Sequence, residues 1–274
     1  MQTLAQIRQI LEEHGLSPRH ALGQNFLVDH NLLRRLVDAA QIAPGETVLE
    51  VGPGTGTLTE ELLERGARVV ACELDDSLAD VLAARLGSRP GFTLVRGDCL
   101  ASKRAVNPEI LRALRDAGSF KLVANLPYGA ATPLMLALLT SHPSCVGMWV
   151  TVQDEVADRL VAKPGTDAYG TISVVAAALA EGRKIARLPP ECFWPRPEVT
   201  SAMAQLVRRP EPMTDDPVGF AEFCQKLFMQ RRKQLGSTLK GFSAWPEGVV
   251  ATDRAEKLPP ERLIALFESV RRAG

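Results

Sequence analysis

The feature that most constrains the fold is a glycine-rich turn that follows a short apolar run. Residues 47–52 read Thr-Val-Leu-Glu-Val-Gly, and the turn continues through Pro53, Gly54, Thr55 and Gly56 before leucines recur at helical spacing. A strand that passes through glycines into a helix brings backbone close to a bound cofactor, as in Rossmann-like folds. The rest of the chain is then expected to complete a parallel sheet covered by helices.

The pattern of the following residues supports this α/β expectation. Strands are predicted at 47–52, 68–74, 92–98, 121–126 and 146–152, with helices at 58–65, 77–86 and 154–162. Ahead of the sheet, helices are predicted at 4–14 and 31–40, joined by a loop at 17–29. Two apolar runs, 172–180 and 202–207, are expected to be edge strands of the same sheet. The alternation predicts helices on both faces of a parallel sheet.

A change in composition divides the chain in two. The proline-rich segment 209–217 separates the predicted sheet from two helical stretches, 220–239 and 260–271. The sequence therefore predicts an α/β domain over 1–207, including an N-terminal helical segment over 1–45. A small all-helical domain is predicted over 208–274. Residues 101–119 are expected to form a long loop.

Composition narrows the possible functions. Lys plus Arg equals Asp plus Glu at 32 each, so a global basic signature for nucleic-acid binding is missing, although basic residues gather in the second half. The five cysteines are scattered, which predicts buried thiols, and the four histidines lack metal-ligand spacing, which predicts no metal site. The short apolar stretches and the uncharged start predict a cytoplasmic protein without a membrane segment.

Three acidic residues stand at the carboxyl ends of successive predicted strands. Glu50 lies two residues before Gly52, Glu73 ends the second strand, and Asp98 ends the third. These positions suit a cofactor ammonium, two ribose hydroxyls and an adenine amine, respectively. Each carboxylate alone could be a solvated strand end, but together they describe S-adenosylmethionine. The G-x-G-x-G spacing, without a following Lys-Ser/Thr pair, disfavours NAD and ATP.

The fourth strand ends in Asn125, Leu126, Pro127 and Tyr128, which indicates the substrate. The lone pair of an aromatic amine is delocalised into its ring, so methylation needs acceptors that hold both amine protons. An Asn oxygen and a backbone carbonyl supply such acceptors, and Pro127 stiffens the turn without offering a donor. Tyr128 offers a face for an extruded base. Alone, this turn would be interpreted as a tight turn with a core tyrosine; after the cofactor motifs, it predicts methylation of adenine.

These motifs resemble the KsgA family of small-subunit rRNA adenine N6,N6-dimethyltransferases over nearly the whole chain. The matching stretches are Leu22 to Leu27, Glu50 to Gly56, Glu73, Gly97 with Asp98, Asn125 to Tyr128, 153–157 with Arg159, Tyr169 with Gly170, Ser173 with Val174, 193–202, 231–233 and 254–256. The resemblance implies cofactor contacts by Asn25 and Leu27, beside the glycines Gly52, Gly54 and Gly56. It also implies a base-holding role for Phe193 and RNA phosphate contacts by Arg231, Arg232 and Lys233.

The resemblance implies a class I methyltransferase fold and up to two methyl transfers to each of two adjacent adenines near the 3′ end of 16S rRNA. The substrate would be an assembling small subunit, and the enzyme a monomer. Two alternatives stay open. One is a large-subunit rRNA adenine methyltransferase of the macrolide-resistance type, which shares the motif series. The other is a ribosome-assembly factor with weak or no methylation, which the neutral charge and the residues Gly129 to Thr132 after the tyrosine would permit.

Overall fold

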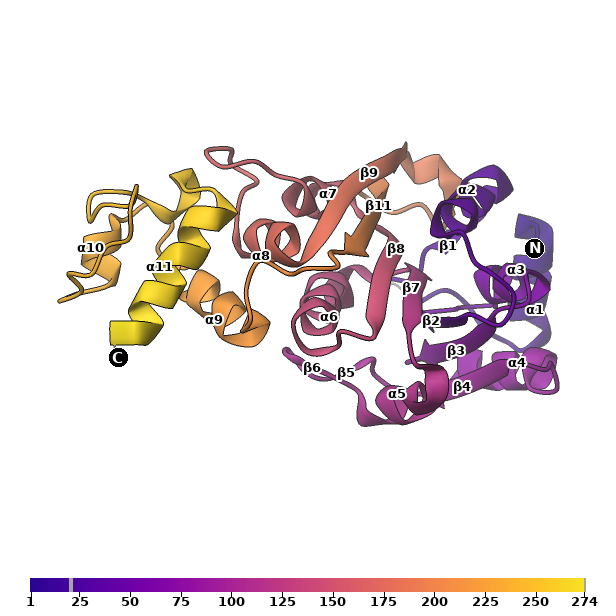
Figure 1. The fold of residues 1–274 in the computed structure, drawn as a ribbon. Coiled ribbons are helices and arrows are strands. Elements are labelled where there is room, and N and C mark those ends of the chain that lie inside the picture. The colour runs from indigo at the N-terminus through magenta and orange to yellow at the C-terminus, as the bar shows by residue number, and fades with distance from the viewer. Residues whose placement is uncertain (20–21, 274) are drawn as a thin grey trace.

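A seven-stranded sheet forms the centre of the molecule (Figure 1). The structure is a computed structural model that describes residues 1–19 and 22–273. The strand order is β4-β3-β2-β7-β8-β11-β9. The bounds are β2 (Thr47–Val51), β3 (Arg68–Glu73), β4 (Phe92–Arg96), β7 (Phe120–Asn125), β8 (Cys145–Gln153), β9 (Ala180–Leu188) and β11 (Ser201–Arg208). Strands β4, β3, β2, β7 and β8 pair in parallel, which confirms the five predicted strands and the parallel sheet.

Helices cover both faces of this sheet, as predicted. The helices of the α/β region are α1 (Leu4–Glu13), α2 (His30–Ala40), α3 (Thr57–Glu64), α4 (Asp76–Leu86), α5 (Pro108–Ala113), α6 (Tyr128–Ser141), α7 (Asp154–Leu160) and α8 (Thr171–Leu179). One apolar layer joins α2 and α3 to side chains such as Val48 and Val69. The opposite layer joins α5, α6 and α8 to side chains such as Leu49 and Val70. Successive residues of a strand point to opposite faces, so each strand feeds both layers.

The two predicted edge strands differ from the structure. Residues 172–180 are expected from their pattern to be extended but lie mostly in α8, which is buried almost throughout. A short continuous apolar run fits a buried helix as well as a strand, and here the Ser173 hydroxyl accepts a hydrogen bond from the Gly170 N–H at the helix start. Strand β11 forms where predicted but lies inside the sheet, antiparallel to both β8 and β9. The strand at this edge of the sheet is β9. Its many polar residues give no apolar run, so the sequence pattern did not predict it.

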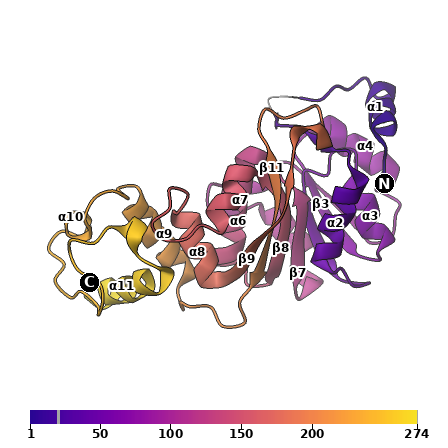
Figure 2. The same ribbon diagram turned by 90° about the horizontal axis from the view of Figure 1, so that it is seen from above.

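The C-terminal segment is helical but is not two long helices. It contains α9 (Pro217–Phe228), α10 (Leu235–Thr238), a 3-10 helix (Ala255–Lys257) and α11 (Pro260–Ala273). The helix expected over 220–239 stops at Phe228, and a turn leads to the short α10, where the backbone N–H groups of Leu235 and Gly236 donate to the carbonyls of Asp253 and Ala251. The segment lies at the opposite end of the molecule from α1 (Figures 1 and 2). Its apolar core is continuous with that of α6 and α8.

The segment expected to be one long loop over 101–119 has regular structure. It holds the hairpin of β5 (Leu100–Ser102) and β6 (Ala105–Val106), then α5 and a 3-10 helix (Arg115–Ala117). The predicted loop over 17–29 includes residues 20 and 21, which lie outside the described residues. Its last residues include β1 (Phe26–Leu27), which pairs with β10 (Phe193–Trp194) after the 3-10 helix Pro190–Cys192. Two segments far apart in the sequence therefore meet at the sheet's carboxyl edge.

All five cysteines are free thiols and only Cys192 is not fully buried, in agreement with the prediction. Within the described residues of the chain, no helix combines the length and the apolarity that a membrane crossing needs.

Candidate cofactor and substrate site

A cavity of about 530 Å³ opens at the carboxyl ends of β2, β3 and β7, a size typical of small-molecule sites. Here β2 is flanked by strands whose connections run in opposite directions, which is where α/β sheets bind ligands. Eleven of the residues predicted for the site line it: Asn25, Leu27, Glu50, Gly52, Gly54, Glu73, Asp98, Asn125, Leu126, Pro127 and Tyr128. The structure therefore brings together residues that span 104 positions of the chain.

The glycine turn lines this cavity, and neighbouring side chains leave little room for a Cβ atom at two of its glycines. A Cβ on Gly54 would lie 2.7 Å from the Phe26 ring, and the backbone there has φ +61°. A Cβ on Gly52 would lie 3.1 Å from the Pro127 ring. The turn is thus pressed between the N-terminal segment and the turn that follows β7. Gly56 does not line the cavity; it precedes α3 and faces α4.

Two buried carboxylates lie side by side behind the turn. Glu50 is 1% exposed and accepts a 2.7 Å hydrogen bond from the Thr59 hydroxyl. Burial raises its pKa to about 8, and the nearby Glu73 charge adds to this effect. Among the described residues no cationic side chain forms an ion pair with either carboxylate. The site therefore holds two carboxyl groups without a cationic partner among the described residues, which suits a cationic ligand.

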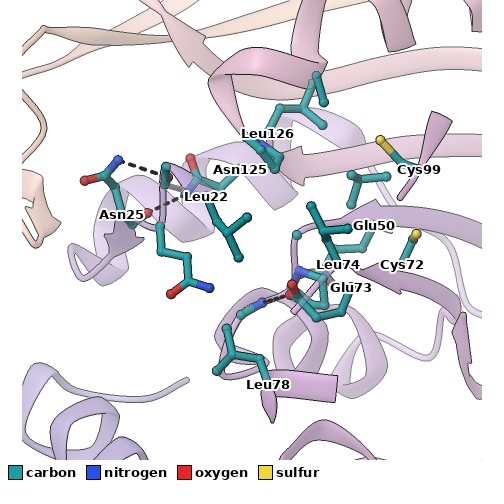
Figure 3. A pocket seen from close by; sticks show the side chains of 18 of the residues that line it. Leu22, Asn25, Glu50, Cys72, Glu73, Leu74, Leu78, Cys99, Asn125 and Leu126 are labelled. Carbon is teal, nitrogen blue, oxygen red and sulfur yellow. Dashed lines mark hydrogen bonds between the residues drawn. The ribbon is translucent and has the colours of Figure 1, made fainter. Parts of the chain in front are cut away.

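Backbone N–H groups hold Glu73 in place. Its two oxygens accept from Gly54 at 3.1 Å and from Asp75 at 2.9 Å, while burial raises its pKa. Figure 3 shows Glu73 and Glu50 on neighbouring strands beside the pocket, with Leu74 next to Glu73; the Leu74 side chain is exposed. Asp98 is exposed at the rim, where its Oδ1 accepts from the Leu100 N–H. Sequence reasoning missed Leu74, although its place directly after a strand-end carboxylate was a usable signal.

The Asn125 side chain has a fixed orientation. Its Nδ2 donates a 2.9 Å hydrogen bond to the backbone oxygen of Asn25, as the dashed line in Figure 3 marks. Its Oδ1 is buried and has no hydrogen-bond partner among the described residues. A buried acceptor without a partner is costly, so this oxygen is poised for a donor from a ligand. The neighbouring Tyr128 side chain also has a hydrogen bond that orients it, since its hydroxyl lies 2.7 Å from the Ser201 Oγ.

Four predicted residues lie away from the cavity. Phe193 is 2% exposed, packs in the layer of α2 and α3, and pairs with Leu27. Arg231, Arg232 and Lys233 lie in a turn after α9, not on a helix as expected. Arg231 forms a 2.8 Å ion pair with Glu256 and donates to the backbone of Asp167. Only Arg232 and Lys233 are exposed.

The sheet order, the acidic glycine turn and the Asn125–Tyr128 turn at the cavity define a Rossmann-like methyltransferase. The family model described as "Ribosomal RNA adenine dimethylase" matches residues 15–272. The chain belongs to the ribosomal RNA adenine dimethylase family.

Curated relatives support this assignment. A "Ribosomal RNA small subunit methyltransferase A" of Phenylobacterium zucineum is 40% identical over 98% of this chain and 94% of its own length. A protein of the same name from Thermotoga maritima is 37% identical over 96% of this chain and 89% of its own length. Both matches cover the α/β region and the C-terminal helices.

Solved structures agree on the fold. A dimethyladenosine transferase from Plasmodium falciparum gives a TM-score of 0.71 at 19% identity and covers 90% of this chain and 97% of that one. The 23S rRNA methyltransferase ErmE gives a TM-score of 0.66 at 26% identity and covers 90% of this chain and 100% of that one. The identity is higher with the small-subunit enzymes named above than with ErmE.

Proposed function

We propose that this protein transfers methyl groups from S-adenosylmethionine to the N6 amines of two adjacent adenines near the 3′ end of small-subunit (16S) rRNA. The observation that carries the proposal is the buried Asn125 Oδ1, left without a hydrogen-bond partner among the described residues, beside the ring of Tyr128. An amine proton of adenine supplies the missing donor. The relatives named as small-subunit rRNA methyltransferases support the choice of RNA.

The cavity residues fit S-adenosylmethionine. When bound, this cofactor supplies an electrophilic methyl group on a positively charged sulfur. Glu50 and Glu73 would compensate its cationic end and bind its ribose hydroxyls, with Asp98 at the adenine amine. Asn25, Leu27 and the glycines Gly52 and Gly54 complete the cradle; Gly56 supports it by letting α3 pack on α4.

The turn after β7 performs the positioning. Asn125 Oδ1 accepts one amine proton, and a backbone carbonyl of Leu126 or Pro127 accepts the other, so the nitrogen lone pair points at the methyl group. Pro127 has no N–H to compete for these acceptors. Tyr128 stacks on the extruded base. The methyl group that the bound cofactor supplies would replace one amine proton, which would pass to solvent, while Asn125 and the carbonyl of the turn hold the amine. Fixed geometry supplies most of the rate.

The C-terminal residues 208–274 are proposed to dock on rRNA of an assembling small subunit, as a small helical domain that packs on α6 and α8 of the methyltransferase domain over residues 1–207. Arg232 and Lys233 are the exposed candidates for phosphate contacts, whereas Arg231 holds the turn through Glu256. A base contact by Phe193 would require its side chain, which is 2% exposed, to leave the layer of α2 and α3 when RNA binds. The enzyme would act as a cytoplasmic monomer.

The test is methyl transfer from labelled S-adenosylmethionine to small subunits that lack adenine dimethylation, with modified positions mapped by mass spectrometry. We expect dimethyladenosine at two adjacent 3′-terminal positions. Asn125→Ala should lower kcat at least about a hundredfold, because an acceptor aimed at the reacting amine is lost. Asn31→Ala, which changes an exposed asparagine on α2, is the matched control and should leave kcat unchanged.

Each alternative function gives a different result when large-subunit rRNA is offered as a second substrate in a parallel reaction. Methylation of large-subunit rRNA alone would indicate an enzyme that resembles ErmE. Binding of cofactor and subunit without any transfer would refute the catalytic proposal and favour the assembly factor. Retained activity in Asn125→Ala would refute the role given to its oxygen.

A further inference from the structure

Tyr128 is anchored by a residue from a distant strand. Its hydroxyl lies 2.7 Å from the Oγ of Ser201, the first residue of β11. Ser201 is 0% exposed, and in register it lies between Gln153 of β8 and Leu188 of β9. A hydroxyl on an interior strand with paired neighbours on both sides has a fixed position. Ser201 is therefore a rigid anchor, whereas Tyr128 is the first residue of α6, directly after the turn that follows β7.

We propose that Ser201 is a positioning residue for methyl transfer, which holds the Tyr128 ring beside the Asn125 oxygen. This inference rests on the proposed function. Two hydrogen bonds then fix the two halves of the substrate site: the Asn25 carbonyl sets the amide of Asn125, and Ser201 sets the ring of Tyr128. Both partners come from outside the turn that they orient. The ring of Tyr128 borders the cavity, so without Ser201 it gains freedom to rotate into the space of the base.

If this hydrogen bond only stabilised the fold, its loss would lower stability. The positioning role predicts a loss in kcat instead. Tyr128 is only partly buried at the cavity wall, so in Ser201→Ala a water molecule can take the place of the serine as partner of the Tyr128 hydroxyl. Loss of the bond should then change stability little but lower the share of molecules whose ring is correctly placed. Because only that share reacts, the effect falls on kcat with RNA and leaves cofactor binding unchanged.

The experiment compares Ser201→Ala, Tyr128→Phe and the double variant with the wild type in the full chain. Each single change removes the same hydrogen bond and keeps the aromatic ring, so we expect each to lower kcat roughly fivefold to tenfold. The double variant should fall no further than the single ones. The dissociation constant for S-adenosylmethionine should stay within about twofold. Ser269→Ala is the control, because it removes a buried serine bond to the Ala244 carbonyl at the far end of the molecule.

The outcomes separate this inference from the function on which it rests. An inactive wild type refutes the proposed function. An active wild type with unchanged kcat in Ser201→Ala overturns the positioning role alone. Losses that multiply in the double variant also overturn it, because they would show that the two hydroxyls act independently. A loss in Ser201→Ala that Ser269→Ala matches overturns it too, because it would mark general destabilisation.

Discussion

Replacing Glu50 by Gln tests whether the buried acid binds the cofactor's cationic end. In the unbound protein the pKa of Glu50 is raised to about 8, because the carboxyl is buried without a cation. A cationic ligand favours the ionised form, so binding should release a proton below pH 8. Cofactor affinity should therefore rise with pH until Glu50 is ionised before binding. The Gln variant has no proton to release.

The magnitude follows from the fraction of Glu50 that is ionised. With a pKa of about 8, this fraction is about 1% at pH 6 and about half at pH 8. The dissociation constant for S-adenosylmethionine should therefore fall about fiftyfold over this range in the wild type. Isothermal titration calorimetry in two buffers of different ionisation enthalpy measures both the affinity and the released proton. The cofactor's own amine titrates near pH 8 in both proteins, so the ratio of wild type to Gln variant isolates Glu50.

Parallel pH profiles of cofactor affinity for the two proteins would refute this reasoning.

The raised pKa of Glu50 also predicts how the stability of the unbound protein depends on pH. A carboxyl whose folded pKa is raised from 4.5 to about 8 contributes stability that is fully present below pH 4.5 and is lost as the pH rises through about 8. The unbound wild type should thus lose thermal stability between about pH 5 and pH 8 and level off above pH 8, and Glu50→Gln should lose less.

Two further predictions concern the glycine turn and the C-terminal turn. Gly54→Ala should abolish cofactor binding in a filter assay, because its Cβ would meet the Phe26 ring at 2.7 Å at a backbone angle of φ +61°. Gly241→Ala should bind normally, because it lies outside the cavity and, at a similar backbone angle of φ +79°, no atom lies within 4 Å of the added carbon. Equal losses would contradict the packing argument. Arg231→Ala should lower the melting temperature, since it breaks the ion pair with Glu256. Lys233→Ala should keep the melting temperature and reduce the salt dependence of RNA binding by about 0.7 in slope, and the reverse pattern would show that the two roles are exchanged.

The sequence determined the sheet and most of the cavity. Strand-forming apolar runs end within two residues of Glu50, Glu73, Asp98 and Asn125, and a parallel sheet puts all such ends at one edge. The prediction of a strand for the apolar run in α8 is wrong, because period and residue type do not distinguish a strand from a helix that is buried on all sides. That choice is made by the surroundings, in this case the sheet and α9.

Only the tertiary structure decided which groups orient the chemical ones. The Asn25 carbonyl and the Ser201 hydroxyl have no local signal, because each reaches its partner across at least 73 residues of sequence. The same holds for Arg231, whose charge resembles a phosphate contact in the sequence but pairs with Glu256 in the fold. Local patterns specify elements and strand ends, whereas long-range packing fixes the side-chain orientations on which a reaction depends.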